Sequence, residues 1–207
     1  DIPVKMVLLG CLVITLFMWL FPGIPVNSVG AFTVLVFGFF LQFAASLPQY
    51  QSSVRDGVWC ASTRYTYLSW PIHELAGKTL GIIGYGHIGT QVGVMAEALG
   101  MQVIYHDIET KLALGNAQPA FGLEDLLARA DIVTLHVPET AATQDMIGAA
   151  QLAAMKPGAH LINASRGTVV DIDALDAALE SGHIGGAAVD VFPIEPKGNG
   201  DAFVSPL

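Results

Sequence analysis

The chain has 207 residues, of which 53% are hydrophobic, and a net charge of −9 with only nine lysines and arginines. This composition excludes a disordered protein, and the few scattered basic residues argue against a nucleic-acid partner. Its two cysteines, Cys11 and Cys60, are too few for a disulfide framework or a zinc site. We therefore predict no metal centre and a reducing, cytoplasmic environment.

The first 47 residues are unusual because no charged residue occurs between Met6 and Leu47. They contain two apolar runs, 6–21 and 34–45, and the first is shorter than the roughly 20 residues that span a bilayer. We expect a buried strand followed by a core helix, and a membrane hairpin is the alternative. Residues 1–30 are then a hydrophobic N-terminal segment or the apolar remnant of a second domain. Apolar surface left uncovered there predicts a homo-oligomer.

Residues 79–90 have the pattern of a strand, a tight turn and a helix. The apolar residues 80–83 precede Gly84, Gly86 and Gly89, which have the G-x-G-x-x-G spacing of a dinucleotide-binding turn. In such a turn the first glycine allows the bend, the second lets a pyrophosphate approach, and the third lets the helix pack closely. Glycines also occur in ordinary turns, so this spacing alone is weak evidence.

The apolar run 101–105 is followed by His106 and Asp107. Its position after the glycine turn strengthens the interpretation of that turn as a dinucleotide-binding site. Asp107 lies 18 residues after Gly89, near the position where an acidic residue binds the adenosine ribose of a dinucleotide. A carboxylate there repels the 2′-phosphate of NADP, so the spacing favours NAD as the cofactor. The alternative is an aspartate that only caps a helix.

Helices and strands alternate along the rest of the chain, with an irregular crossover at 115–122. We predict helices at 123–130 and 151–155 and a third that is capped by Asp171 or Asp173, and strands at 132–137, 159–163 and 187–192. This alternation predicts an α/β fold, a Rossmann-like, doubly wound parallel sheet over residues 31–207. Ligands bind beyond the carboxyl ends of such strands, which makes His136, Arg166 and Glu195 functional candidates.

Arg166 and Glu195 each lie in a turn just after a predicted strand. Arg166 can form a structural ion pair with a carboxylate such as Asp190, or it can clamp the carboxylate of a substrate through two hydrogen bonds. Glu195 lies between two prolines. It can be merely solvated, or it can accept a hydrogen bond from a catalytic histidine and raise the pKa of that histidine.

Four motifs in order, at 75–89, 135–138, 161–171 and 188–196, resemble the D-isomer-specific 2-hydroxyacid dehydrogenases. The resemblance covers residues 31–207. Residues 84–207 are most similar to the branch that acts on D-3-phosphoglycerate, and 70–77 to the glycerate branch. The resemblance implies hydride transfer between NAD and C2 of a D-2-hydroxy acid or 2-oxo acid of one of these two types.

The resemblance also implies a role for individual residues. In the family, the positions of His87 and Ile88 line the pyrophosphate, and that of Asp107 holds the ribose. Arg166 would orient the substrate, and Glu195 would pair with the acid/base histidine of a Pro-His-Ile-Gly-Gly loop. The complete predicted cofactor site consists of Gly84, Gly86, His87, Ile88, Gly89, Asp107, His136, Val137, Pro138, Ala164, Ser165 and Asp190.

The sequence departs from the family pattern at its end. The histidine loop is expected about twenty residues beyond Pro206, and the sequence stops at Leu207. The segment 183–186, His-Ile-Gly-Gly, imitates that loop but precedes Glu195, so we expect no catalytic role for His183. We therefore expect an incomplete NAD-binding domain with a truncated remnant of a substrate domain, which binds NAD and turns over only traces of substrate. A catalytically silent module that binds or senses NAD and a membrane-attached variant are the alternatives.

Overall fold

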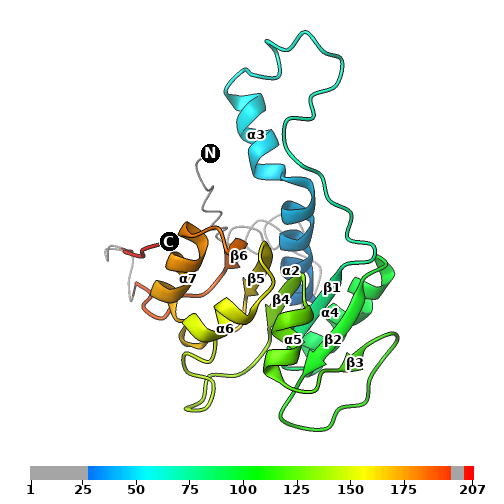
Figure 1. Ribbon diagram of the computed structural model, residues 1–207, viewed down its shortest axis with the longest axis vertical. Helices are drawn as coiled ribbons and strands as arrows, with labels where there is room; N and C mark the ends of the chain where they lie inside the picture. Colours follow the sequence, from blue (N-terminus) through cyan, green and yellow to red (C-terminus); the bar gives the residue numbers. More distant parts are fainter. Residues whose placement is uncertain (1–27, 197–202) are drawn as a thin grey trace.

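The computed structural model describes residues 28–196 and 203–207 (Figure 1). The predictions made for residues 6–21 lie outside this part of the chain. A parallel sheet forms its centre, with strands β1 Thr79–Ile83, β2 Gln102–His106, β3 Gln118–Pro119, β4 Ile132–Leu135, β5 Ala159–Asn163 and β6 Ile184–Val189. The strand order is β3-β2-β1-β4-β5-β6, so the direction of winding reverses between β1 and β4. This doubly wound topology agrees with the predicted fold class.

The helices cover both faces of the sheet (Figure 1). Their bounds are α2 Ser28–Ala45, α3 Leu47–Arg55, α4 His87–Ala98, α5 Leu123–Arg129, α6 Ala149–Ala154 and α7 Ile172–Glu180. Successive strand residues point to opposite faces, so Ile82 packs with α2 and α4 whereas Ile83 packs with α5. Two buried apolar layers result, as both faces of a parallel sheet require.

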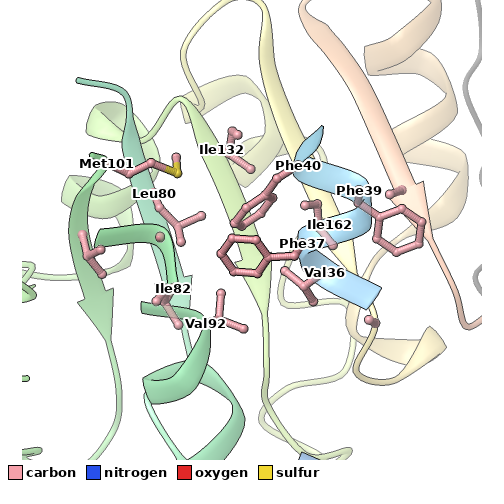
Figure 2. Close-up of a cluster of buried hydrophobic side chains, with 14 of the residues drawn as sticks. Val36, Phe37, Phe39, Phe40, Leu80, Ile82, Val92, Met101, Ile132 and Ile162 are labelled. Carbon is pink, nitrogen blue, oxygen red and sulfur yellow. The ribbon is translucent and has the colours of Figure 1, made fainter. Parts of the chain in front are cut away.

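The apolar run 34–45 lies in helix α2, which confirms the predicted core helix. Val36, Phe39 and Phe40 are fully buried, and Figure 2 shows Phe37 and Phe40 packed toward the residues of β1, β4 and α4. Among the described residues no single helix is long and apolar enough to cross a membrane. Helices α2 and α3 meet that criterion only when taken together, and they are bent by 66° at their junction.

Two sequence predictions about strands need correction. The crossover expected to be irregular contains the two-residue edge strand β3, which pairs with β2 through Ile104 and Tyr105. The last strand begins at Ile184 and ends at Val189, earlier than the predicted 187–192. Gly185 and Gly186 suggested a turn, but a Cβ at Gly185 would lie 2.5 Å from the Gly158 carbonyl oxygen. Without a Cβ at Gly185, β6 can lie close to Gly158, which directly precedes β5. This glycine therefore serves the approach of two chain segments and not a turn.

An arm made of α3 and the segment 56–72 projects from the domain (Figure 1). Ser46, with a left-handed φ of 49°, makes the bend from α2 into this arm. Inside the arm, the buried Ser53 Oγ accepts hydrogen bonds from Trp70 Nε1 at 3.0 Å and from Tyr67 Oη at 3.4 Å. Tyr50 Oη donates to the Trp70 carbonyl oxygen. These contacts give the arm a structure of its own.

Candidate functional site

The three glycines of the turn between β1 and α4 have different surroundings. Gly84 has φ +91°, and a Cβ there would lie 2.5 Å from the His136 carbonyl oxygen. A Cβ on Gly89 would lie 2.3 Å from the Gly84 carbonyl oxygen. Nothing lies within 4 Å of a Cβ on Gly86. The fold therefore requires Gly84 and Gly89, whereas Gly86 leaves open space at the N-terminus of α4, where an anion is stabilised.

Asp107 follows β2 and connects that strand to the glycine turn. Its Oδ2 accepts a hydrogen bond from Tyr85 N at 2.8 Å, and its Oδ1 accepts one from Glu109 N at 2.9 Å. A loop and not a helix follows Asp107, so the helix-capping alternative is wrong. The carboxylate is thus fixed beside the turn, where two acceptor oxygens can meet ribose hydroxyls.

His136 follows β4, directly across from the glycine turn. Its backbone N donates to the Ile83 carbonyl oxygen, and its Nε2 lies 3.0 Å from the buried Thr134 Oγ1. Burial lowers the pKa of His136 to about 4, because the charged form is costly away from water. His136 is therefore uncharged at neutral pH. Its carbonyl group limits the space at Gly84, and Val137 contacts the same turn.

Asn163, which the sequence analysis did not select, organises the loop that carries Arg166. It is fully buried at the end of β5, and its Oδ1 accepts hydrogen bonds from both N and Oγ of Ser165. Its Nδ2 donates to the Arg166 carbonyl oxygen at 3.0 Å, and its own carbonyl oxygen accepts from Asp190 N. The side chain and the backbone of this one buried residue thus hold three predicted site residues. Its signal in the sequence was a polar residue at the end of an apolar strand.

The Arg166 loop packs directly on the segment that leads to Glu195. A Cβ on Gly167 would lie 2.0 Å from the Phe192 carbonyl carbon and 2.4 Å from Pro193 N. Arg166 is exposed, and its Nη1 donates to the Ser165 carbonyl oxygen at 2.7 Å. Glu195 is also exposed, and its Oε1 accepts from Phe192 N at 3.0 Å. The two predicted catalytic residues therefore belong to loops in contact.

The structure brings the predicted site residues to the carboxyl edge of the sheet. His87 and Ile88 begin α4, Pro138 follows β4, and Ala164 follows β5. His183 differs: it precedes β6 at the opposite edge, where its Nε2 lies 3.1 Å from the Leu152 carbonyl oxygen. Within the described residues, no group of three or more metal-ligating side chains occurs.

The family model for the D-isomer specific 2-hydroxyacid dehydrogenase, NAD binding domain, matches residues 37–206. The chain belongs to this family. It is 51% identical over 183 residues to D-3-phosphoglycerate dehydrogenase of Escherichia coli K12, covering 88% of this chain and 43% of that protein. The chain therefore spans less than half the length of this relative. Family membership agrees with the parallel sheet and with NAD as the cofactor of this domain.

Two solved structures show the same fold. D-Lactate dehydrogenase of Aquifex aeolicus, complexed with NAD and lactic acid, is 33% identical, with a TM-score of 0.72, over 82% of this chain and 50% of that chain. A D-isomer specific 2-hydroxyacid dehydrogenase of Xanthobacter autotrophicus Py2, complexed with NADPH, is 32% identical, with a TM-score of 0.68, over 82% of this chain and 52% of that chain.

Proposed function

We propose that this chain forms the cofactor half of a dehydrogenase that transfers a hydride between NAD and C2 of a D-2-hydroxy acid. The observation that carries this proposal is the placement of the glycine turn, Asp107 and Arg166 at one edge of the sheet. The 51% identity to the E. coli relative supports an acid of the D-3-phosphoglycerate type, and D-glycerate is the second choice.

The residues present fit NAD. Open space beside Gly86 accommodates the pyrophosphate against the N-terminus of α4, and the fixed carboxylate of Asp107 accepts hydrogen bonds from the ribose. Bound NAD supplies the hydride chemistry. The half-buried, uncharged His136 after β4 and the buried Ser165 after β5 lie at the same edge of the sheet as the glycine turn and Arg166.

Arg166 is suited to hold the substrate. Its contact with the Ser165 carbonyl oxygen uses one of the five N–H donors of the guanidinium, and a carboxylate bound in bidentate fashion needs two. The guanidinium has hydrogen-bond donors and no acceptor, so it orients and polarises the acid but does not accept its proton. Glu195 is held by Phe192 N in an exposed turn, where it can support an acid/base histidine.

Titration calorimetry tests this proposal in two steps, first with NADH and then with the 2-oxo acid of D-3-phosphoglycerate on the NADH-saturated protein. We expect Arg166→Gln to weaken binding of the acid by about tenfold or more, with NADH affinity unchanged, because a charge-assisted pair is lost. Arg129→Gln, which removes the surface partner of Asp125, is the matched control. Equal acid affinity in the two variants would contradict the role of Arg166.

We further propose that the chain associates with a second copy through its arm. The arm exposes apolar side chains, among them Tyr65, Leu68 and Ile72. Residues 47–72 carry two arginines and one aspartate, whereas the whole chain has a net charge of −9. The arm of one copy is therefore complementary to the acidic body of another.

A further inference from the structure

Two charged residues follow Asp107 in the loop after β2. Lys111 forms an ion pair with the Glu109 carboxylate, and its Nζ lies 4.0 Å from Asp107 Oδ1. Asp107 is only 12% exposed, whereas the side chain of Glu109 is 70% exposed. Lys111 therefore lies between an inner carboxylate and an outer one, and the outer carboxylate holds its ammonium group.

The position of Lys111 is fixed by the core of the domain. Tyr105 Oη donates a hydrogen bond to the Lys111 carbonyl oxygen at 3.0 Å. The Tyr105 ring stacks on the ring of Tyr85 in the glycine turn, with centroids 4.0 Å apart and planes 15° apart. The backbone of Glu109 is held in turn by Asp107. The charged loop is thus tied to the glycine turn through two tyrosines.

A hollow of about 280 Å³ opens beyond the end of β2, and Lys111 supplies the ammonium group of its lining. Tyr105, Asp107 and Glu109 also line it. Because Asp107 lines this hollow, the hollow lies where the ribose of a bound dinucleotide meets the protein. A 2′-phosphate on that ribose would carry close to two negative charges into it and would need a cation there.

We propose that Glu109 and Lys111 together set the preference of this site between NAD and NADP, in addition to Asp107. Glu109 pairs with the ammonium group of Lys111 and offsets most of its charge, so that a 2′-phosphate beside Asp107 meets only a partly neutralised cation. When the Glu109 charge is absent, Lys111 is released to pair with a 2′-phosphate. This proposal rests on the assignment of the adenosine ribose to Asp107.

The test is the ratio of dissociation constants for NADP and NAD, measured by displacement of bound NADH at low salt. We expect Glu109→Gln to lower the ratio about fivefold and Lys111→Gln to raise it about fivefold, since an exposed charge pair contributes an effect of about this size. In the variant with both changes, the effect of Glu109→Gln should disappear. Salt should shrink both shifts, because the groups are close to solvent.

Lys156→Gln is the matched control, because Lys156 also pairs with an aspartate, Asp131, at the opposite edge of the sheet. Ratios for Glu109→Gln and Lys111→Gln that stay within twofold of this control, or that move in the same direction, would overturn the proposal. Asp107→Asn separates this failure from that of the ribose assignment. If Asp107→Asn lowers the ratio while Glu109→Gln does not, only the role of the pair is wrong; if neither variant changes it, the ribose assignment fails as well.

Discussion

At the scale of single residues, a substitution at Gly86 should affect ligand binding, whereas one at Gly84 should affect folding. A Cβ on Gly86 meets open space, so Gly86→Val should cost below about 1 kcal/mol of stability, as for a changed N-cap. The added methyl groups enter the space proposed for the pyrophosphate. We expect the affinity for NAD, measured by calorimetry, to fall at least about tenfold, a loss of about 1.4 kcal/mol.

Gly84→Val is the contrasting variant. Its Cβ would lie 2.5 Å from the His136 carbonyl oxygen at a φ of +91°, so we expect a loss of at least about 2 kcal/mol in urea denaturation. If Gly86→Val bound NAD as tightly as the parent protein, the pyrophosphate would have to lie elsewhere. If Gly86→Val were as unstable as Gly84→Val, the space at Gly86 would not be open.

Two half-buried histidines, His136 and His160, make stability depend on pH. Burial lowers the pKa of His136 and of His160 to about 4, whereas the unfolded value is about 6.5. Between these values the unfolded chain binds protons that the folded chain does not, so stability falls as the pH falls and is flat above about 6.5. We expect each histidine to account for about 2 kcal/mol of the loss between pH 7 and pH 5.

Urea denaturation at the two pH values measures this loss in the parent protein and in His160→Gln. His160 lies at the amino end of β5 against Phe43, with ring centroids 4.5 Å apart, far along the sheet from the proposed cofactor site. The variant should lose less stability on acidification than the parent. An unchanged difference between the two pH values would mean that His160 is protonated to the same extent in both states.

At the scale of elements, helix α2 is required by the domain. Phe40 lies between the helix and the sheet (Figure 2) and is 0% exposed, whereas the adjacent Leu41 is 50% exposed. We expect Phe40→Ala to lower the free energy of unfolding by about 3–5 kcal/mol, because it leaves a cavity, and Leu41→Ala to lower it by less than about 1 kcal/mol. Equal effects would show that α2 does not pack on the sheet in solution.

The loops of Arg166 and Glu195 should also be coupled through Gly167. Gly167→Ala places a Cβ 2.0 Å from the Phe192 carbonyl carbon, so the two loops must separate. We expect a loss of about 1–3 kcal/mol in urea denaturation. Gly148→Ala, whose nearest atom would be 3.6 Å away, is the control and should lose less than about 1 kcal/mol. Similar losses in both variants would argue against a close contact.

The sequence predicted elements best where one physical rule was sufficient. Apolar runs bounded by Gly or Pro identified β1, β2, β4 and β5, and the common edge of parallel strands predicted that His136 and Arg166 lie on one side. Strand β3 was missed because its two exposed residues include Pro119 and show no alternation. The role of Asn163 was missed because it depends on hydrogen bonds within one turn, which no periodicity reports.

At the scale of the whole molecule, the chain separates the proposed cofactor site from the arm. The glycine turn and the loops after β2, β4 and β5 lie at the carboxyl edge of the sheet. The return segment of the arm reaches the domain where His73 N donates to the Ala44 carbonyl oxygen, at the end of α2. The arm is therefore joined to the domain through α2, a helix of the core.

The arm should determine whether the protein is monomeric or associates with a second copy. Tyr65 is 98% exposed in the arm and Phe121 is 99% exposed on the domain, so the two form a matched pair of exposed aromatic residues. We expect Tyr65→Ser combined with Leu68→Ser to weaken self-association, because both side chains lose apolar contact with the other copy. Phe121→Ser, which removes one exposed aromatic ring from the domain, should leave association unchanged.

Sedimentation equilibrium over a range of protein concentrations measures this association directly. The parent protein should show a mass of two chains, and the Tyr65 and Leu68 variant should shift toward one chain at the same concentration. Since both substituted residues are exposed, urea denaturation of the variant extrapolated to the monomer should match the parent. A parent protein that stays monomeric at every concentration, or a Phe121→Ser variant that dissociates equally, would show that the exposed apolar residues of the arm do not bind a second copy.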